Sequence, residues 1–227
     1  MVKLNKQCLD YRLYLVTDRT LMSQSSLIDT ISQAIDGGIT MLQLREKKLS
    51  SQAFLEEALA VKTLAKDRHI PLIINDRVDI ALACQADGVH IGQNDLPLPV
   101  VRSLIGADKI IGVSVQTLDQ AIIAEKQGAD YLGVGAMFPT KTKEEAIIVD
   151  HETLAKICQN VSLPIILIGG MTQQTIPLFQ HERINGFAIV SEIMTATETC
   201  HVTQKYRQLI DQQLLNKRGA TCPFLDH

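Results

Sequence analysis

The sequence predicts a single eight-stranded parallel β/α barrel, a TIM barrel, and three observations lead to it. Eight short runs rich in Val, Ile and Leu recur along the chain, and amphipathic or polar stretches separate them. The length of 227 residues suits one such barrel. A glycine pair, Gly169-Gly170, follows the seventh run, and phosphate sites after strands seven and eight are typical of barrels.

The apolar runs predict strands because each is continuous rather than alternating, as in strands buried on both faces. In chain order they cover residues 12–16, 41–44, 72–74, 88–91, 110–113, 131–134, 165–168 and 187–190. An open doubly wound sheet is the alternative architecture. It usually carries a Gly-rich phosphate loop after its first strand, whereas Thr17-Asp18-Arg19 stands there in this chain. The barrel is therefore favoured.

Helices are predicted between the strands, most clearly over residues 51–68, 117–127, 172–179 and 192–215. Thr117 suits an N-cap, and Gly128 suits the position just after a helix end. Gly37-Gly38 and Gly106 mark the ends of further helices that precede strands. We expect residues 1–10 to form an N-terminal extension, residues 11–215 the catalytic barrel, and residues 216–227 a disordered C-terminal tail.

The composition and net charge exclude some classes of binding partner. A net charge of −3 gives no basic field that would hold nucleic acid or an anionic membrane. The five cysteines are scattered without a CxxC pair, which is typical of reduced thiols in the cytoplasm. The chain shows no signal-peptide pattern and no apolar run near the roughly 20 residues that span a bilayer. We expect a cytoplasmic protein that acts on small phosphorylated molecules. The sequence is compatible with a homo-oligomer and does not decide the oligomeric state.

Acidic side chains follow two neighbouring predicted strands, Asp76 after the third and Asp95 after the fourth. The carboxyl ends of barrel strands meet at one rim, so these two carboxylates should lie close together. Two adjacent carboxylates repel unless a cation or proton sits between them, and hard oxygen ligands favour Mg²⁺. The sequence predicts a magnesium site here. The alternative is that each aspartate only caps a helix.

Groups suited to phosphate follow other strands. Gln43, Arg45 and Lys47 alternate along an extended segment, so they share one face. The alternative is a solvated strand end with Arg45 paired to Glu46 or Asp18. Residues 139–143, Pro-Thr-Lys-Thr-Lys, could close over a diphosphate or be an exposed basic turn. Gly170 and Ser191, each before a predicted helix start, could together cradle a monophosphate.

Ser114 ends the fifth strand, but no base for a nucleophilic serine can be named, so hydrogen bonding to a polar ring is the favoured role. His90, between Val89 and Ile91, is more typical of a hydrogen-bonded structural histidine than of a base or ligand. The sequence has no Ser-His-Asp order, no nucleophilic cysteine at a strand end and no dinucleotide fingerprint. This absence favours catalysis by metal, charge and positioning rather than by a covalent intermediate.

From about residue 11 to residue 215 the chain resembles the thiamine phosphate synthase family. The specific parts of the resemblance are residues 90–97, His-Ile-Gly-Gln-Asn-Asp-Leu-Pro, and the Phe-Pro-Thr-Lys-Thr-Lys loop at 138–143. Shorter matches are Gln-Leu-Arg-Glu-Lys at 43–47, Ile-Asn-Asp at 74–76, Gly-Val-Ser at 112–114, Gly-Ala-Met at 135–137 and Ile-Gly-Gly-Met at 168–171.

The resemblance implies a transferase that joins an aminopyrimidine methyl diphosphate to a thiazole monophosphate, releasing diphosphate. Asp76 and Asp95 would bind Mg²⁺, and Arg45 and Lys143 would neutralise the leaving group. The pyrimidine diphosphate would be held by Gln43, Arg45, Lys47, Asn75, Ser114 and Lys143, and the thiazole phosphate by Thr140, Thr142, Gly170, Val190 and Ser191. Rival readings are a thiazole tautomerase, another phosphate-binding barrel isomerase, or a precursor-binding regulatory protein without turnover.

Overall fold

The computed structural model describes residues 6–22, 26–140, 147–180 and 182–215. Half of the predicted N-terminal extension, residues 1–5, and the whole predicted tail, residues 216–227, lie outside these ranges. The same holds for Lys141, Thr142 and Lys143 of the predicted phosphate loop.

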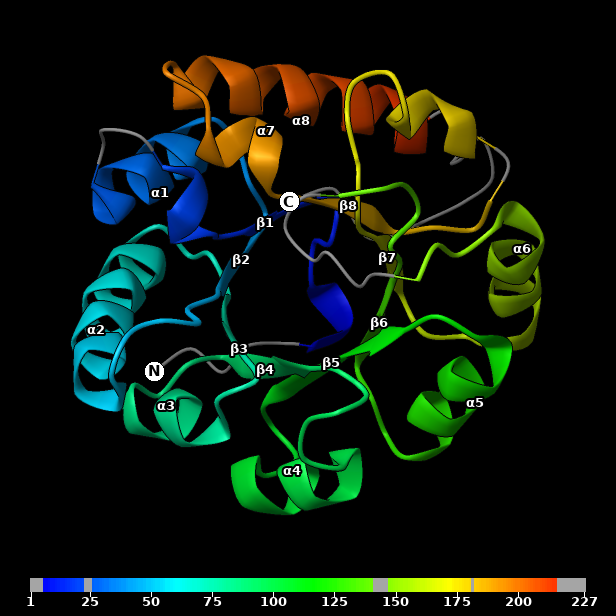
Figure 1. Cartoon of the computed structure of the whole chain (residues 1–227), viewed down its shortest axis with the longest axis horizontal. Coiled ribbons are helices and arrows are strands. Elements are labelled where there is room, and N and C mark those ends of the chain that lie inside the picture. The colour runs from blue at the N-terminus through cyan, green and yellow to red at the C-terminus, as the bar shows by residue number, and fades with distance from the viewer. Residues whose placement is uncertain (1–5, 23–25, 141–146, 181, 216–227) are drawn as a thin grey trace.

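Eight parallel strands close into a barrel in which each strand pairs with the next and β8 pairs with β1 (Figure 1). Their bounds are β1 Leu13–Val16, β2 Met41–Leu44, β3 Leu72–Asn75, β4 Gly88–Ile91, β5 Ile110–Val115, β6 Tyr131–Val134, β7 Ile165–Leu167 and β8 Gly186–Ile189. All eight predicted strands are confirmed to within two residues, and so is the predicted fold class.

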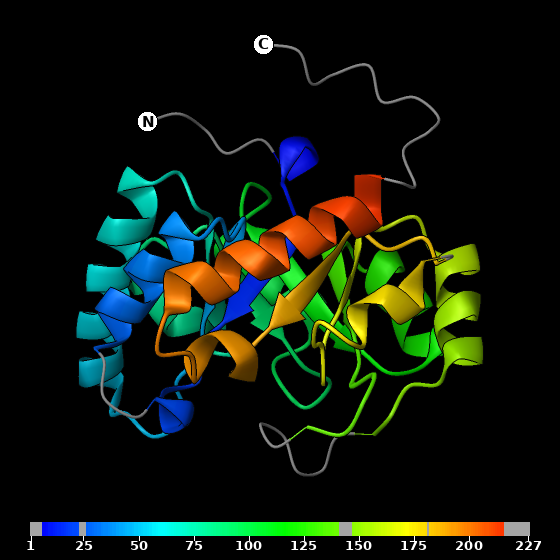
Figure 2. The same ribbon diagram turned by 90° about the horizontal axis from the view of Figure 1, so that it is seen from above.

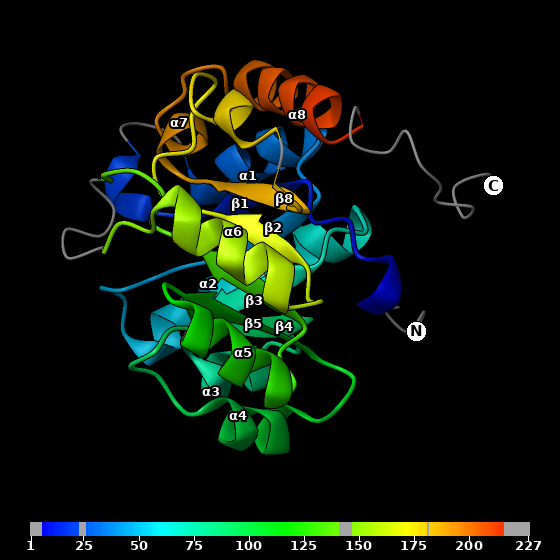
Figure 3. The same cartoon turned by 90° about the vertical axis from the view of Figure 1, so that its right-hand side faces the viewer.

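Helices surround the barrel, as Figures 1 and 3 show. Their bounds are α1 Leu27–Asp36, α2 Ser51–Asp67, α3 Val78–Ala83, α4 Leu98–Ile105, α5 Leu118–Lys126, α6 His151–Asn160, α7 Ser191–Met194 and α8 Thr199–Leu215, with 3₁₀ helices η1 Lys6–Cys8, η2 Arg19–Leu21 and η3 Ile176–Phe179. Side-chain oxygens of Ser26, Ser50, Thr117 and Asp150 accept the N–H three residues on, which starts α1, α2, α5 and α6. None of the described helices combines the length and apolarity needed to cross a bilayer.

Two predicted helices differ in the structure. Residues 172–179 form a turn and then only the short η3, although the hydroxyls of Thr172 and Thr175 accept each other's backbone N–H at 3.2 and 2.8 Å, a pattern that caps helix starts. Pro177 adds a residue without an N–H. The predicted helix over 192–215 is two helices, α7 and α8, with a break at residues 195–198.

The strands separate two apolar regions. Tyr14 and Val16 of β1 point into the barrel, whereas Leu13 and Leu15 point outward against the helices. The interior cluster comprises Tyr11, Tyr14, Val16, Met41, Ile73, Ile110, Tyr131, Ile166 and Ala188. Figure 2 shows η1, in dark blue, beyond the end of the barrel where the strands begin. The interior is therefore packed from that end, and functional side chains gather at the other.

The outward-facing strand residues carry much of the stability. Leu42 of β2 is fully buried, so Leu42→Ala should lower the free energy of unfolding by about 2–5 kcal/mol. Leu59 of α2 is 47% exposed, and Leu59→Ala should change it by less than about 0.5 kcal/mol. Urea unfolding of both variants followed by circular dichroism measures the difference, and equal losses would contradict the assigned core.

Candidate active site

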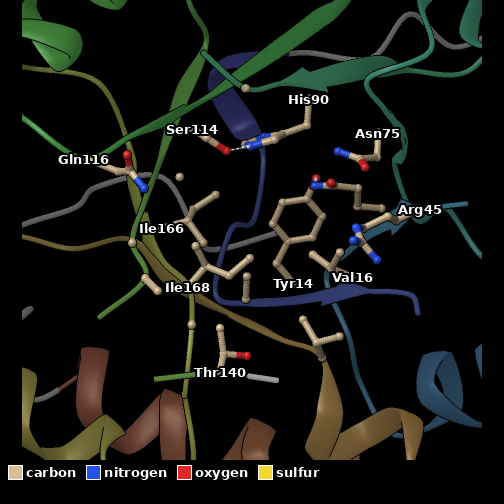
Figure 4. A pocket seen from close by; sticks show the side chains of 18 of the residues that line it. Tyr14, Val16, Arg45, Asn75, His90, Ser114, Gln116, Thr140, Ile166 and Ile168 are labelled. Atoms are coloured by element: carbon tan, nitrogen blue, oxygen red, sulfur yellow. Dashed lines mark hydrogen bonds between the residues drawn. The ribbon is translucent and has the colours of Figure 1, made fainter. Parts of the chain in front are cut away.

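A cavity of about 750 Å³ opens at the carboxyl ends of the strands and draws residues from around the barrel (Figure 4). It has the size expected of a small-molecule site. The structure brings these predicted site residues together in its lining: Gln43, Arg45, Lys47, Asn75, Asp76, Asp95, Ser114, Thr140, Gly170, Val190 and Ser191. The predicted contacts of Thr142 and Lys143 lie outside the described residues.

The two aspartates lie close to each other and neither caps a helix. Arg77 precedes α3 and Pro97 precedes α4, so the cap interpretation is wrong for both carboxylates. Asp76 has a φ of +60°, in the left-handed region that aspartate tolerates better than most residues. Its N–H donates to the carbonyl of His90 at 2.9 Å, which fixes the turn that aims the carboxylate into the cavity.

Asp95 is held from the adjacent turn, where its Oδ2 accepts the N–H of Gly92 at 2.6 Å. Burial raises the pKa of the Asp95 carboxyl, and the nearby negative charge of Asp76 adds to that rise. The described residues contain no group of three His, Cys, Asp or Glu that could hold a metal. Two carboxylates beside open space still fit Mg²⁺, which completes its shell with water and substrate phosphate.

Arg45 faces the same cavity and is oriented by a buried carboxylate. Its Nη1 donates to Asp18 Oδ2 at 2.9 Å, and its backbone N–H donates to the Thr17 hydroxyl at 3.0 Å. Asp18 is itself fixed, because its Oδ1 accepts the N–H of Thr20 at 3.0 Å. The predicted alternative of a pair with Asp18 is thus present, but a guanidinium has five N–H donors and others remain for a phosphate.

The loop that carries Arg45 and Lys47 is also anchored by ion pairs of Arg19. Arg19 Nε donates to Glu46 Oε1 at 3.1 Å, and the same guanidinium contacts Glu57 of α2. Lys47 contacts the Asp76 carboxylate, which links the cationic and acidic parts of the cavity. These contacts hold the loop with its two cations beside the acidic pair.

The loop after β7 needs glycine. Gly170 has a φ of +66°, and a Cβ there would lie 2.5 Å from the Cβ of Phe138. Its carbonyl accepts the Thr175 hydroxyl at 2.9 Å, which holds the turn. Ser191 begins α7, but that helix has four residues and η3 does not start at Thr172, so the expected pair of helix starts is not found. An anion here would depend on backbone N–H groups and hydroxyls rather than on helix dipoles.

A buried polar chain forms the inner end of the cavity, and sequence reasoning missed its two tyrosines. Gln43 Nε2 donates to Tyr14 Oη at 2.9 Å, and Tyr14 Oη lies 2.8 Å from Tyr131 Oη. His90 Nδ1 lies 2.9 Å from Tyr131 Oη, and its Nε2 lies 2.8 Å from Ser114 Oγ. Both tyrosines stand within apolar runs at inward strand positions, and that register is the signal that could have found them.

The histidine that the sequence suggested as structural is therefore hydrogen-bonded and also lines the cavity. It supplies Ser114 with a ring nitrogen, but the next group is the phenol of Tyr131 and not a carboxylate. Burial raises the pKa of the Tyr131 hydroxyl, so the phenol stays neutral and cannot stabilise an imidazolium. The arrangement suits hydrogen bonding to a polar ring better than nucleophilic attack.

The remaining walls are apolar or amide-bearing. Ile166 and Ile168 face the cavity from the β7 side, and Gln116 lies near them (Figure 4). Arg45 and Asn75 lie on one side of the cavity and Thr140 on another (Figure 4). A flat heterocycle could pack on the isoleucines while charged groups stay at the rim. Ile166 and Gln116 carry no motif of their own, which is why the sequence did not mark them, whereas Ile168 opens the Ile-Gly-Gly-Met match at 168–171.

Comparison with known proteins shows which family the chain is similar to. A family model described as thiamine monophosphate synthase matches residues 13–193. The thiamine-phosphate synthases of Clostridium botulinum (strain Eklund 17B / Type B) and Clostridium beijerinckii are 49% and 52% identical, over 91% and 83% of this chain and 97% and 90% of theirs.

A solved structure, thiamine phosphate pyrophosphorylase from Pyrococcus furiosus, superposes with a TM-score of 0.83 at 33% identity, covering 91% of this chain and 98% of that one. A 3-hexulose-6-phosphate synthase at 15% identity and a TM-score of 0.66 shares the fold alone. The match of the family model across most of the barrel, with relatives near half identical, shows that this chain belongs to the thiamine monophosphate synthase family.

Proposed function

We propose that this chain joins an aminopyrimidine methyl diphosphate to a thiazole monophosphate, giving thiamine phosphate and diphosphate. The main supporting observation is that one cavity holds an acidic pair, Asp76 and Asp95, next to the cationic Arg45 and Lys47, with a glycine-bearing loop elsewhere on its rim that could bind a phosphate. A site for one monophosphate would need only the last of these. Two phosphorylated substrates and a divalent cation account for all three.

The pyrimidine diphosphate is assigned to the side of the cavity that carries Arg45 and Asn75. This group is completed by Gln43, Lys47 and Ser114, and by Lys143, which lies outside the described residues. The thiazole phosphate is assigned to the rim formed by Gly170, Val190 and Ser191 with Thr140 and the undescribed Thr142. Ile166 and Ile168 lie among the lining residues and offer the heterocycles an apolar surface.

Asp76 and Asp95 would hold Mg²⁺, and the donor set supports this because burial, and after it the charge of Asp76, raise the pKa of Asp95, and a cation between the carboxylates would offset both effects. When bound, Mg²⁺ supplies charge neutralisation to the departing diphosphate. Lys47 contacts Asp76, so it would add a positive charge beside the cation that Asp76 would hold. The cavity thus gathers positive charge where the leaving group gains negative charge.

The chain's own residues then act by position. The methylene carbon–oxygen bond breaks and its electron pair leaves with the diphosphate toward Arg45 and Lys47. The aminopyrimidine ring carries the resulting positive charge while Ser114 and Gln43 hold it. The thiazole nitrogen donates its lone pair to the methylene carbon and forms the new carbon–nitrogen bond. That nitrogen has no proton to lose, so no enzyme base is required. This agrees with the site, where Ser114 is hydrogen-bonded to His90 and His90 to the neutral phenol of Tyr131.

The test is a direct assay with both substrates, with excess Mg²⁺ or with EDTA, followed by chromatography of thiamine phosphate. We expect product and diphosphate in equal amounts with Mg²⁺ and a loss of at least about 100-fold with EDTA. Thiazole phosphate alone serves as the control incubation. Isomerisation of the thiazole without coupling would identify a tautomerase, and binding without any product would identify a precursor-binding protein; either result would overturn the proposal.

A further inference from the structure

We propose that the buried chain from Gln43 through Tyr14, Tyr131 and His90 fixes the direction of the Ser114 hydroxyl, so that Ser114 donates a hydrogen bond to the substrate. Tyr131 and His90 would then be positioning residues, because they act on the ligand through Ser114. That the ligand is the aminopyrimidine rests on the proposed function. The order of the protons along the chain does not depend on the proposed function.

The chain is continuous and almost free of solvent. Its links measure 2.9, 2.8, 2.9 and 2.8 Å from Gln43 to Ser114, and they cross the barrel interior between residues up to 117 positions apart. Tyr14 and Tyr131 are at most 1% exposed, and His90 is 8% exposed. Figure 4 shows Ser114 and His90 joined at the inner end of the cavity, near the ring of Tyr14. Water has little room to reset the order of the protons.

The order follows from the donor at the start. Gln43 Nε2 carries two hydrogens and donates to Tyr14 Oη. Tyr14 and Tyr131 are at most 1% exposed, so the hydroxyl hydrogen of each needs a protein acceptor. Among the contacts described, the hydrogen of Tyr14 finds it in Tyr131 Oη, and that of Tyr131 in His90 Nδ1. His90 Nδ1 accepts, so its proton lies on Nε2, which donates to Ser114 Oγ. The Ser114 hydrogen is left to point into the cavity.

The phenols support this order by keeping their protons. Burial raises the pKa of both tyrosine hydroxyls, Tyr14 and Tyr131, so each remains a donor of one hydrogen bond. If Gln43 instead turned its amide oxygen to Tyr14, each link would reverse, and Ser114 would donate to His90 and offer the ligand only a lone pair. The amide of Gln43 therefore acts as the switch that sets the polarity of the chain.

Two strand glycines make room for the chain. A Cβ at Gly112 of β5 would lie 2.3 Å from Tyr131 Oη and 2.5 Å from His90 Nδ1. A Cβ at Gly133 of β6 would lie 3.0 Å from His90 Cε1. Glycine weakens a strand, so its use at both inward positions that flank the imidazole indicates that the Tyr131–His90 contact needs this space.

A fixed donor at Ser114 selects the chemistry of the ligand. It bonds to an acceptor such as a pyrimidine ring nitrogen, and it opposes an amino group presented at the same point. A hydroxyl held in place by the chain loses little freedom on binding, so the bond costs less than one made by a freely rotating serine. The residue thus serves to recognise and orient the ring.

The first experiment measures the protons without substrate. The protein is labelled with ¹⁵N-histidine, and the His90 ring signals are assigned by their loss in His90→Gln. We expect a protonated Nε2 and a bare, hydrogen-bonded Nδ1. Tyr131→Phe should shift the Nδ1 signal, whereas Tyr11→Phe, which removes a hydroxyl from the same interior cluster but outside the chain, should not. A proton on Nδ1, or unchanged signals in Tyr131→Phe, would overturn the proposal.

The second experiment measures binding of the pyrimidine diphosphate with Mg²⁺ and without the thiazole. Tyr131→Phe should weaken binding about 3- to 10-fold and Ser114→Ala by a similar factor, while Tyr11→Phe stays near wild type. The double variant should lose no more than either single variant, because both act through one hydroxyl. Additive losses of affinity in the double variant would overturn the proposal that Tyr131 acts through the Ser114 hydroxyl. No binding by the wild type would refute the proposed function and leave the ring signals to decide the proton order.

Discussion

Asp76→Asn and Asp95→Asn are each expected to lower the rate of thiamine phosphate formation by about 10²–10³-fold, with the fold intact. Asparagine keeps the shape of aspartate but removes the charge that would hold Mg²⁺ beside the departing diphosphate. Because burial and the charge of Asp76 raise the pKa of Asp95, its neutralisation relieves repulsion in the metal-free protein. We therefore expect the melting temperature of Asp95→Asn without Mg²⁺ to equal or exceed that of the wild type.

The matched control is Asp79→Asn. Asp79 lies on α3, close in sequence to Asp76, but its carboxylate is 63% exposed and paired with Arg77 outside the cavity. Its rate should stay within about two-fold of the wild type. The rates of the two active-site variants should recover partly at high Mg²⁺, since a weakened site still fills by mass action. Near-normal rates in both Asp76→Asn and Asp95→Asn would refute the metal assignment.

The strands and the position of the site were predictable because they depend on local pattern and on one geometric rule. Each apolar run is followed by a polar residue or a glycine, and parallel strands of a barrel end at the same rim. Asp76 and Asp95 therefore had to meet once both strands were recognised. The contact between Arg45 and Asp18 could be named as an alternative for the same reason, because both follow neighbouring strands.

The interior chain was not predictable because it depends on register and closure. Tyr14 and Tyr131 read as ordinary apolar residues within strands, and only the closed barrel brings their hydroxyls to 2.8 Å. The pairing of His90 with Gly112, and of Gly112 with Tyr131, places the imidazole against the phenol. The helix expected at Thr172 begins with capping bonds between two threonines, but only the short η3 follows, with Pro177 inside it.

Arg45→Ala should lower turnover by about 10²–10³-fold, because the guanidinium neutralises charge that develops only as the diphosphate departs. A loss confined to that step lowers kcat more than it raises KM for the pyrimidine diphosphate. Arg45→Lys should recover only part of the rate, since an ammonium cannot bind Asp18 and a phosphate with one planar fork. Steady-state kinetics with both substrates varied measures the three enzymes.

A variant of Asp18 distinguishes the positioning of Arg45 from its charge in the same kinetic experiment. Asp18→Asn keeps Arg45 and its charge but removes the carboxylate that aims it, and losing a charged hydrogen bond of this kind should cost about 10-fold in rate. Arg45→Ala combined with Asp18→Asn should then be no slower than Arg45→Ala alone, because Asp18 acts only through the arginine. Arg77→Ala, which removes a partly exposed arginine outside the cavity, is the control for charge. If Arg77→Ala slowed the enzyme as much as Arg45→Ala, a general field and not an aimed guanidinium would drive departure of the diphosphate.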